Sequence, residues 1–68
     1  MSNKIPRNAK KMDVEFLRQT SAAKPGDHII VRKEEDNGWV GTDQAGKEWA
    51  FLLPLLRNEY ICKISVLE

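Results

Sequence analysis

The sequence has a single cysteine, Cys62, and a single histidine, His28. One cysteine excludes an intramolecular disulfide and a cluster of thiolate ligands around a metal. It also favours a reducing setting, so we expect a cytoplasmic protein. Any histidine-based metal site or catalytic dyad would have to share His28, and no recognisable nucleophile turn surrounds either residue. We therefore expect no enzyme activity, no metal and no cofactor.

Long apolar runs are also missing. The longest, residues 50–56, is interrupted by Pro54 and falls far short of the roughly 20 residues of a membrane span. Residues 1–11 contain too few apolar side chains for a secretory signal peptide, and we expect no membrane association. The terminal pair Leu67-Glu68 is of a kind that a cloning site can leave, so its origin stays open.

Neither sign of charge dominates. The net charge of +1 gives no general case for nucleic acid or for a membrane surface. The charges are nevertheless unevenly placed, because residues 1–11 carry four basic residues and no acidic one, which leaves seven basic against ten acidic residues in the rest. We expect residues 1–11 to form a flexible basic arm and residues 12–68 to form one small domain.

Alternating apolar and polar residues indicate a mainly β domain. The clearest strand is expected at residues 28–33, where Ile29 and Val31 share one face. Residues 12–23 fit a strand or a helix, and the strand is preferred. Further strands are expected at residues 39–42, 47–51 and 59–66. The pattern predicts about five antiparallel strands.

Turn residues separate these expected strands. Lys24-Pro25-Gly26-Asp27 has the Pro and Gly positions of a β-turn. Residues 34–38 join three adjacent carboxylates to Asn-Gly, which reverses the chain, and residues 43–46 close a hairpin. Pro54 lacks the N–H that a central ladder needs, so residues 52–56 are expected to form a buried turn or a short 3₁₀ turn.

Three motifs follow one another in a characteristic order: Lys24-Pro25-Gly26-Asp27, then Gly38-Trp39 after the acidic turn, then Gly46-Lys47-Glu48-Trp49 before an apolar segment. This order resembles that of an SH3-like small barrel, of the bacterial or eukaryotic type, over residues 25–56. The resemblance implies a small five-stranded barrel with a 3₁₀ turn near Pro54. Polyproline recognition in such domains needs aromatic walls, for which Trp39, Pro54 and Tyr60 are the residues present here.

Trp39 and the acidic turn beside it form the candidate binding site. An indole presents a large apolar face, and neighbouring carboxylates would suit a positively charged or Arg-containing peptide. Trp49 and Phe51 are instead expected in the core. We therefore expect a non-catalytic module that binds a protein or peptide partner through Trp39, Glu34, Glu35, Asp36, Pro54 and Tyr60.

Two other hypotheses stay open. In the first, the basic arm together with Arg32 and Lys33 contacts the phosphates of a nucleic acid while an aromatic side chain stacks on a base. In the second, the chain is a small subunit of a larger complex, because 68 residues bury a small core and residues 51–56 are apolar. The sequence leaves the partner, the pathway and the choice between monomer and weak oligomer open.

Overall fold

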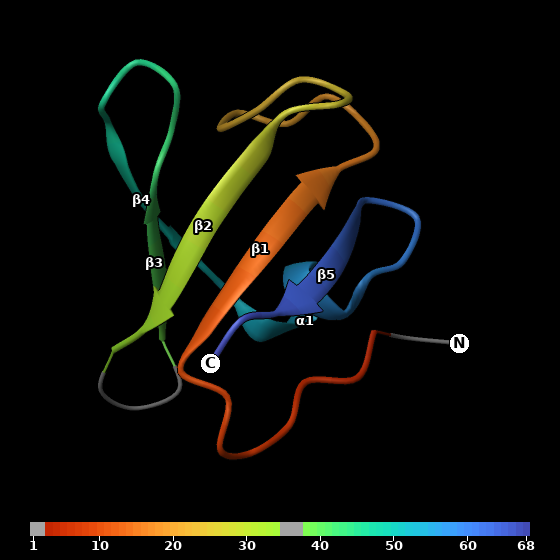
Figure 1. Cartoon of the computed structure of the whole chain (residues 1–68). Helices are drawn as coiled ribbons and strands as arrows, with labels where there is room; N and C mark the ends of the chain where they lie inside the picture. The colour runs from red at the N-terminus through yellow and green to blue at the C-terminus, as the bar shows by residue number, and fades with distance from the viewer. Residues whose placement is uncertain (1–2, 35–37) are drawn as a thin grey trace.

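A computed structural model describes residues 3–34 and 38–68 (Figure 1). Within these residues one sheet contains five antiparallel strands in the order β4-β3-β2-β1-β5. The strands are β1 (Lys11–Phe16), β2 (His28–Lys33), β3 (Trp39–Thr42), β4 (Glu48–Phe51) and β5 (Cys62–Val66). The mainly β prediction is confirmed. The described sheet is not closed into a barrel, because β4 and β5 are its two edges.

Strand β1 lies between β2 and β5, and its side chains alternate between core and surface. Met12 lies opposite Val31 of β2 and opposite Val66 of β5. Met12, Val14 and Phe16 are fully buried, whereas the residues between them are partly exposed. This period of two confirms the strand in the first part of residues 12–23.

The core occupies one face of the sheet and is closed by the helix α1 (Leu53–Arg57). Phe16 and Phe51 meet there with ring centroids 5.8 Å apart. β3 can approach β2 closely because position 41 is glycine: a Cβ there would lie 2.7 Å from the backbone oxygen of Ile30. The buried residues of the core are Ala9, Met12, Val14, Phe16, Ala23, Ile29, Val31, Trp39, Phe51, Leu56 and Cys62.

Helix α1 replaces the 3₁₀ turn expected near Pro54. Pro54 lies in the first turn of α1, where a backbone N–H has no partner within the helix, so proline is tolerated there. The amide of Leu56 donates to the carbonyl of Leu52 over 3.2 Å, and the Leu56 side chain is buried. No helix in the described residues is long and apolar enough to cross a membrane.

The N-terminal segment, residues 3–10, is packed against the domain. The Asn3 amide donates to the carbonyl oxygen of Arg57 over 2.8 Å. Further along, Ile5 packs on the core and Ala9 is buried in it. In Figure 1 the segment runs along the lower side of the molecule before it enters β1. Its basic residues are therefore held at defined places on the surface.

Candidate functional site

Trp39 does not present the exposed indole that we expected from its place after the acidic turn. It is 2% exposed. It lies opposite Lys33 of β2 and Phe51 of β4, and its side chain belongs to the core. Alternation along β3 decides this, because Trp39 and Gly41 point to the face that Phe51 also occupies. The expectation of an exposed Trp39 was wrong.

Trp49, which was expected in the core, is partly exposed on the edge strand β4. Its Nε1–H donates a 2.7 Å hydrogen bond to Oδ2 of Asp43, and Nζ of Lys47 lies 4.5 Å from the ring centroid. The Asp43 carboxylate also accepts the backbone N–H groups of Ala45 and Lys47. The indole hydrogen bond is the main cause that lowers the pKa of Asp43. Trp49 nevertheless packs against the core as a partly buried side chain, so it is less buried than expected, whereas Trp39 is more buried than expected.

The remaining predicted site residues do not gather in one place. Glu34 closes the β2–β3 connection, with its amide donating to the Gly38 carbonyl over 2.8 Å, and is exposed. Glu35 and Asp36 lie outside the described residues. Pro54 is exposed on α1, and Tyr60 is 71% exposed in the turn before β5. Trp39 and Tyr60 line two different cavities, and Pro54 lines neither of them.

A basic pocket of about 300 Å³ lies where the N-terminal segment, the end of β2 and helix α1 meet. Each of these parts contributes one cation: Arg7, Lys33 and Arg57. Nζ of Lys33 donates to the carbonyl oxygen of Arg7 over 3.3 Å, which joins two of the parts. The other described lining residues are uncharged: Ile5, Pro6, Trp39 and Leu53.

No family model, no curated protein and no solved structure matches this chain. Function then has to follow from the chemistry of the site, because a fold alone does not imply one.

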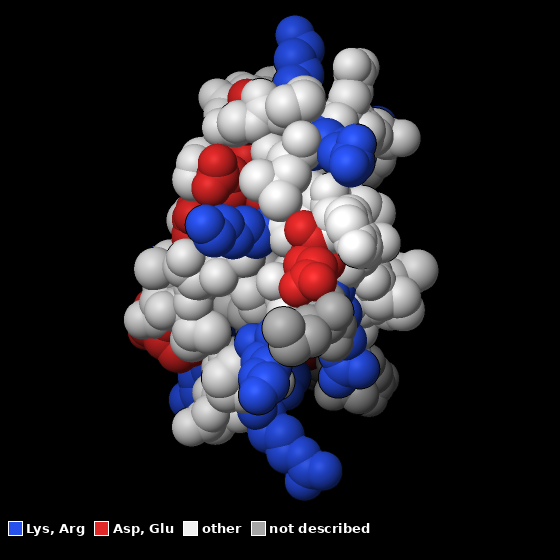
Figure 2. Space-filling view, turned by 90° about the vertical axis from the view of Figure 1, so that its right-hand side faces the viewer, with Lys and Arg blue, Asp and Glu red and all other residues white. Residues whose placement is uncertain are grey.

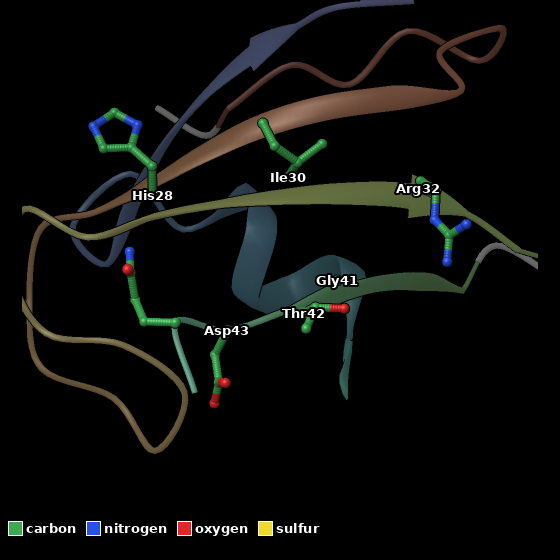
Figure 3. A pocket seen from close by; sticks show the side chains of 7 residues that line it. His28, Ile30, Arg32, Gly41, Thr42 and Asp43 are labelled. Atoms are coloured by element: carbon green, nitrogen blue, oxygen red, sulfur yellow. The ribbon is translucent and has the colours of Figure 1, made fainter. Parts of the chain in front are cut away.

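A second, wider groove of about 470 Å³ lies on the opposite face, over β2 and β3 (Figure 3). His28, Ile30 and Arg32 follow one another along its β2 side, because alternate residues of a strand share a face. Arg32 and Lys33 therefore lie on opposite faces of the sheet. The nucleic-acid hypothesis named both residues for phosphate contact, and the structure places them in two different sites.

His28 in this groove is paired with an acid and not with a nucleophile. Its Nδ1 lies 2.8 Å from Oδ2 of Asp13 on the neighbouring strand. This hydrogen bond is the largest cause that raises the pKa of His28. Cys62 belongs to the core face and is buried, and its burial raises the pKa of the thiol. The two residues of the conceivable Cys-His dyad thus lie on different faces of the sheet.

The basic pocket is the more distinctive of the two sites. The groove combines Arg32 with Asp43, whereas the pocket combines three cations with no described acid. Figure 2 shows Lys and Arg side chains gathered toward the lower end of the molecule, the end where the N-terminal segment runs in Figure 1.

Lys33 and the basic arm were expected at a phosphate-binding surface, whereas Arg57 was not. Positions 7 and 57 are far apart in the sequence, and no local pattern predicts that their side chains line the same pocket. The two meet only because α1 packs beside the N-terminal segment.

Proposed function

We propose that this chain is a non-catalytic binding module and that its ligand is an anionic chain held at the basic pocket. One observation carries this proposal: Arg7, Lys33 and Arg57 converge on one apolar-floored pocket from three separate parts of the chain. Converging cations create a local positive potential that attracts and orients anions. Arginine adds a planar donor fork that matches carboxylate and phosphate oxygens.

This proposal keeps the binding role expected from the sequence and reverses the charge of the ligand. A positively charged peptide was expected because Trp39 would stand exposed beside acidic residues. With Trp39 buried, that site has lost the aromatic face on which cation–π contact depends. Polyproline recognition would lack the same Trp39 side chain as an aromatic wall of its groove.

We also propose that the fold is an open relative of the SH3-like barrels. Gly26-Asp27 precedes β2, Gly38-Trp39 leads into β3, and Gly46-Lys47 leads into β4, as the resemblance implies. The helical turn falls between β4 and β5, at the place of the 3₁₀ turn of that family. These positions support the relationship.

The cytoplasm is the compartment that we propose for this activity. The single cysteine, Cys62, carries a free thiol in the structure. A free thiol suits a reducing compartment.

Charge reversal of the pocket tests the binding role. The double variant Arg7→Glu/Arg57→Glu replaces two exposed cations that come from different parts of the chain. Fluorescence anisotropy would follow two labelled probes at low salt, an oligothymidylate and a poly-glutamate peptide, each of about twelve units. We expect the probe that binds to lose at least about tenfold in affinity, and to bind more weakly as salt is added.

Lys24→Glu is the matched control, because Lys24 is exposed and lines none of the basic pocket. Circular dichroism would confirm that each variant remains folded. The proposal fails if the wild-type chain binds neither probe, or if Lys24→Glu weakens binding as much as the double variant does.

A further inference from the structure

Tyr60 is an exposed aromatic side chain on a well-held piece of backbone. The ring is 71% exposed. The Tyr60 amide donates to Oδ1 of Asn58 over 3.0 Å, and the Tyr60 carbonyl accepts from Nε of Arg18 over 3.1 Å. The next amide, that of Ile61, donates to the Asn58 carbonyl over 3.0 Å. These hydrogen bonds fix the backbone that carries the Tyr60 ring, which is planar and lies outside the core.

A cavity of about 450 Å³ opens beside this ring. Leu17, which is 42% exposed, adds an apolar wall, and Lys63 adds a cation. The Leu17 amide donates to the Ile61 carbonyl over 2.8 Å, so this wall is tied to the turn that carries Tyr60. An exposed aromatic ring beside an aliphatic wall and a cation is a suitable stacking place for a flat, polar-edged ring.

Shared lining residues connect this cavity to the basic pocket along the N-terminal segment. Asn3 lines both the Tyr60 cavity and a cavity of about 270 Å³ that also contains Lys4. Ile5 and Arg57 line that second cavity and the basic pocket as well. We call the three together the basic track. The cations along it are Lys63, Lys4, Arg57, Arg7 and Lys33.

Acidic side chains are sparse on the basic track. Glu59 is the only acid among its described lining residues, and it lies in the Tyr60 cavity. In Figure 2 blue side chains gather at the lower end of the face shown, and red side chains lie toward its middle and left. A negative backbone would therefore follow the Lys4 end of the track, and the Tyr60 end suits an uncharged ring.

From this arrangement we infer that the anionic chain is a single-stranded nucleic acid, with one base stacked on Tyr60 and its phosphates along the cations of the basic track. The inference rests on the proposed function of the basic pocket. A single strand supplies both chemistries at once, because its backbone is charged at every residue and its unpaired bases are free to stack. An acidic peptide supplies the charge, but its carboxylate side chains offer no ring that stacks on Tyr60. In a duplex the bases are stacked on one another and do not reach Tyr60.

Two probes separate the contribution of the Tyr60 ring to binding from that of the cations. One probe is a labelled oligothymidylate of about twelve nucleotides, and the second is an abasic deoxyribose phosphate chain of the same length. Tyr60→Ala should bind the oligothymidylate about tenfold more weakly and the abasic chain unchanged, since a base on an aromatic ring contributes an effect of this order. Tyr60→Phe should retain the affinity, because it keeps the stacking face.

Leu52→Ala is the matched control for loss of an exposed apolar side chain. Leu52 is 75% exposed and lines none of the three cavities of the track. This variant should bind both probes as the wild-type chain does. Arg7→Glu/Arg57→Glu should weaken both probes, because both carry phosphates.

Two results would overturn the inference and leave the proposed function standing. In one, Tyr60→Ala binds the oligothymidylate within about twofold of wild type while the double charge reversal still weakens it. In the other, a poly-glutamate peptide binds more tightly than the oligothymidylate and depends on Arg7 and Arg57 alone, which would make the partner an acidic protein segment. If the double charge reversal changes the affinity for no probe, the proposed function falls together with the inference.

Discussion

The side-chain amide of Asn3 donates a 2.9 Å hydrogen bond to the carbonyl oxygen of Cys62, which lies 59 positions further along the chain. The same nitrogen donates over 2.9 Å to the carbonyl of Leu56 at the end of α1. One side chain thus joins the N-terminal segment to both the helix and the edge strand β5. This side chain adds to the contacts that hold the segment carrying Lys4 and Arg7, which include the hydrogen bond from Lys33 to the Arg7 carbonyl.

Asn3→Ala should therefore lower both stability and affinity. Two carbonyl oxygens in a partly buried place lose their donor, which costs about 1–2 kcal/mol in the free energy of unfolding. Urea unfolding would measure this loss. Binding of the oligothymidylate should weaken as well, because fewer contacts then hold the segment that carries Arg7. Asn8→Ala, which changes an exposed side chain of the same segment, should leave both quantities near the wild-type values.

Trp39→Ala should unfold most of the protein. Truncation of a buried aromatic side chain costs about 3–5 kcal/mol, and a chain of this size has only about that much net stability. Near-ultraviolet circular dichroism and the dispersion of a ¹H-¹⁵N spectrum would report the loss of packing. Leu52→Ala should change the stability by less than about 0.5 kcal/mol, since that side chain is largely exposed. A folded Trp39→Ala protein would contradict the placement of Trp39 in the core.

The His28–Asp13 pair should make stability depend on pH near neutrality. The hydrogen bond to Asp13 raises the pKa of His28 above its ordinary value of 6.5, with smaller contributions from Glu15 and Asp27. The folded state thus favours the protonated ring, so the stabilising contribution is complete below about pH 6.5 and is lost as pH rises through the folded-state pKa. An NMR titration of the His28 ring would measure that pKa.

Asp13→Asn removes the negative partner of His28. In this variant the pKa of His28 should return toward 6.5 and the change of stability across this pH range should become smaller. A wild-type pKa at or below 6.5 would show that the pair seen at 2.8 Å does not persist in solution.

Asp43 should make the stability depend on pH in acid, with the opposite sign. The Trp49 N–H, followed by the backbone amides of Lys47 and Ala45, lowers the pKa of Asp43 from its ordinary value of 3.8. The stabilising contribution is therefore complete above about pH 3.8 and is lost as pH falls through the folded-state pKa. Asp43→Asn should lower the urea midpoint at neutral pH and flatten its decline in acid, as followed by tryptophan fluorescence. Glu48→Gln, at an exposed position on β4, should keep the wild-type profile.

Local patterns predicted the later strands closely, whereas residues 12–23 fitted a strand or a helix and only Lys11–Phe16 forms β1. Residues 28–33 and 39–42 match β2 and β3, while the two later strands are shorter than expected at their starts. Alternation and turn chemistry act over a few neighbouring residues, so they can be seen in the sequence. The α-helix in place of a 3₁₀ turn is a small miss of the same local kind, since both conformations accept proline in the first turn.

The candidate site was much less predictable. Lys33 was named for phosphate contact together with Arg32, yet alternation along β2 separates them, and Arg57 was not named at all. Trp39 and Trp49 each follow a polar turn that contains glycine. The local sequence does not say which of the two side chains is fully buried in the core. Tyr60 was named as an aromatic wall, and its side chain is exposed in the structure.

The sequence by itself determined that this protein is mainly β and where β2 and β3 run, because those features depend on the periodicity and backbone preferences of adjacent residues. Only the tertiary structure decided that Trp39 is buried, that the sheet stays open and that the basic segment packs beside Lys33 and Arg57. The physical reason is that each of these outcomes depends on contacts between residues far apart in the chain. Such contacts are selected by how the side chains fill the core and by which backbone carbonyls Asn3 can reach.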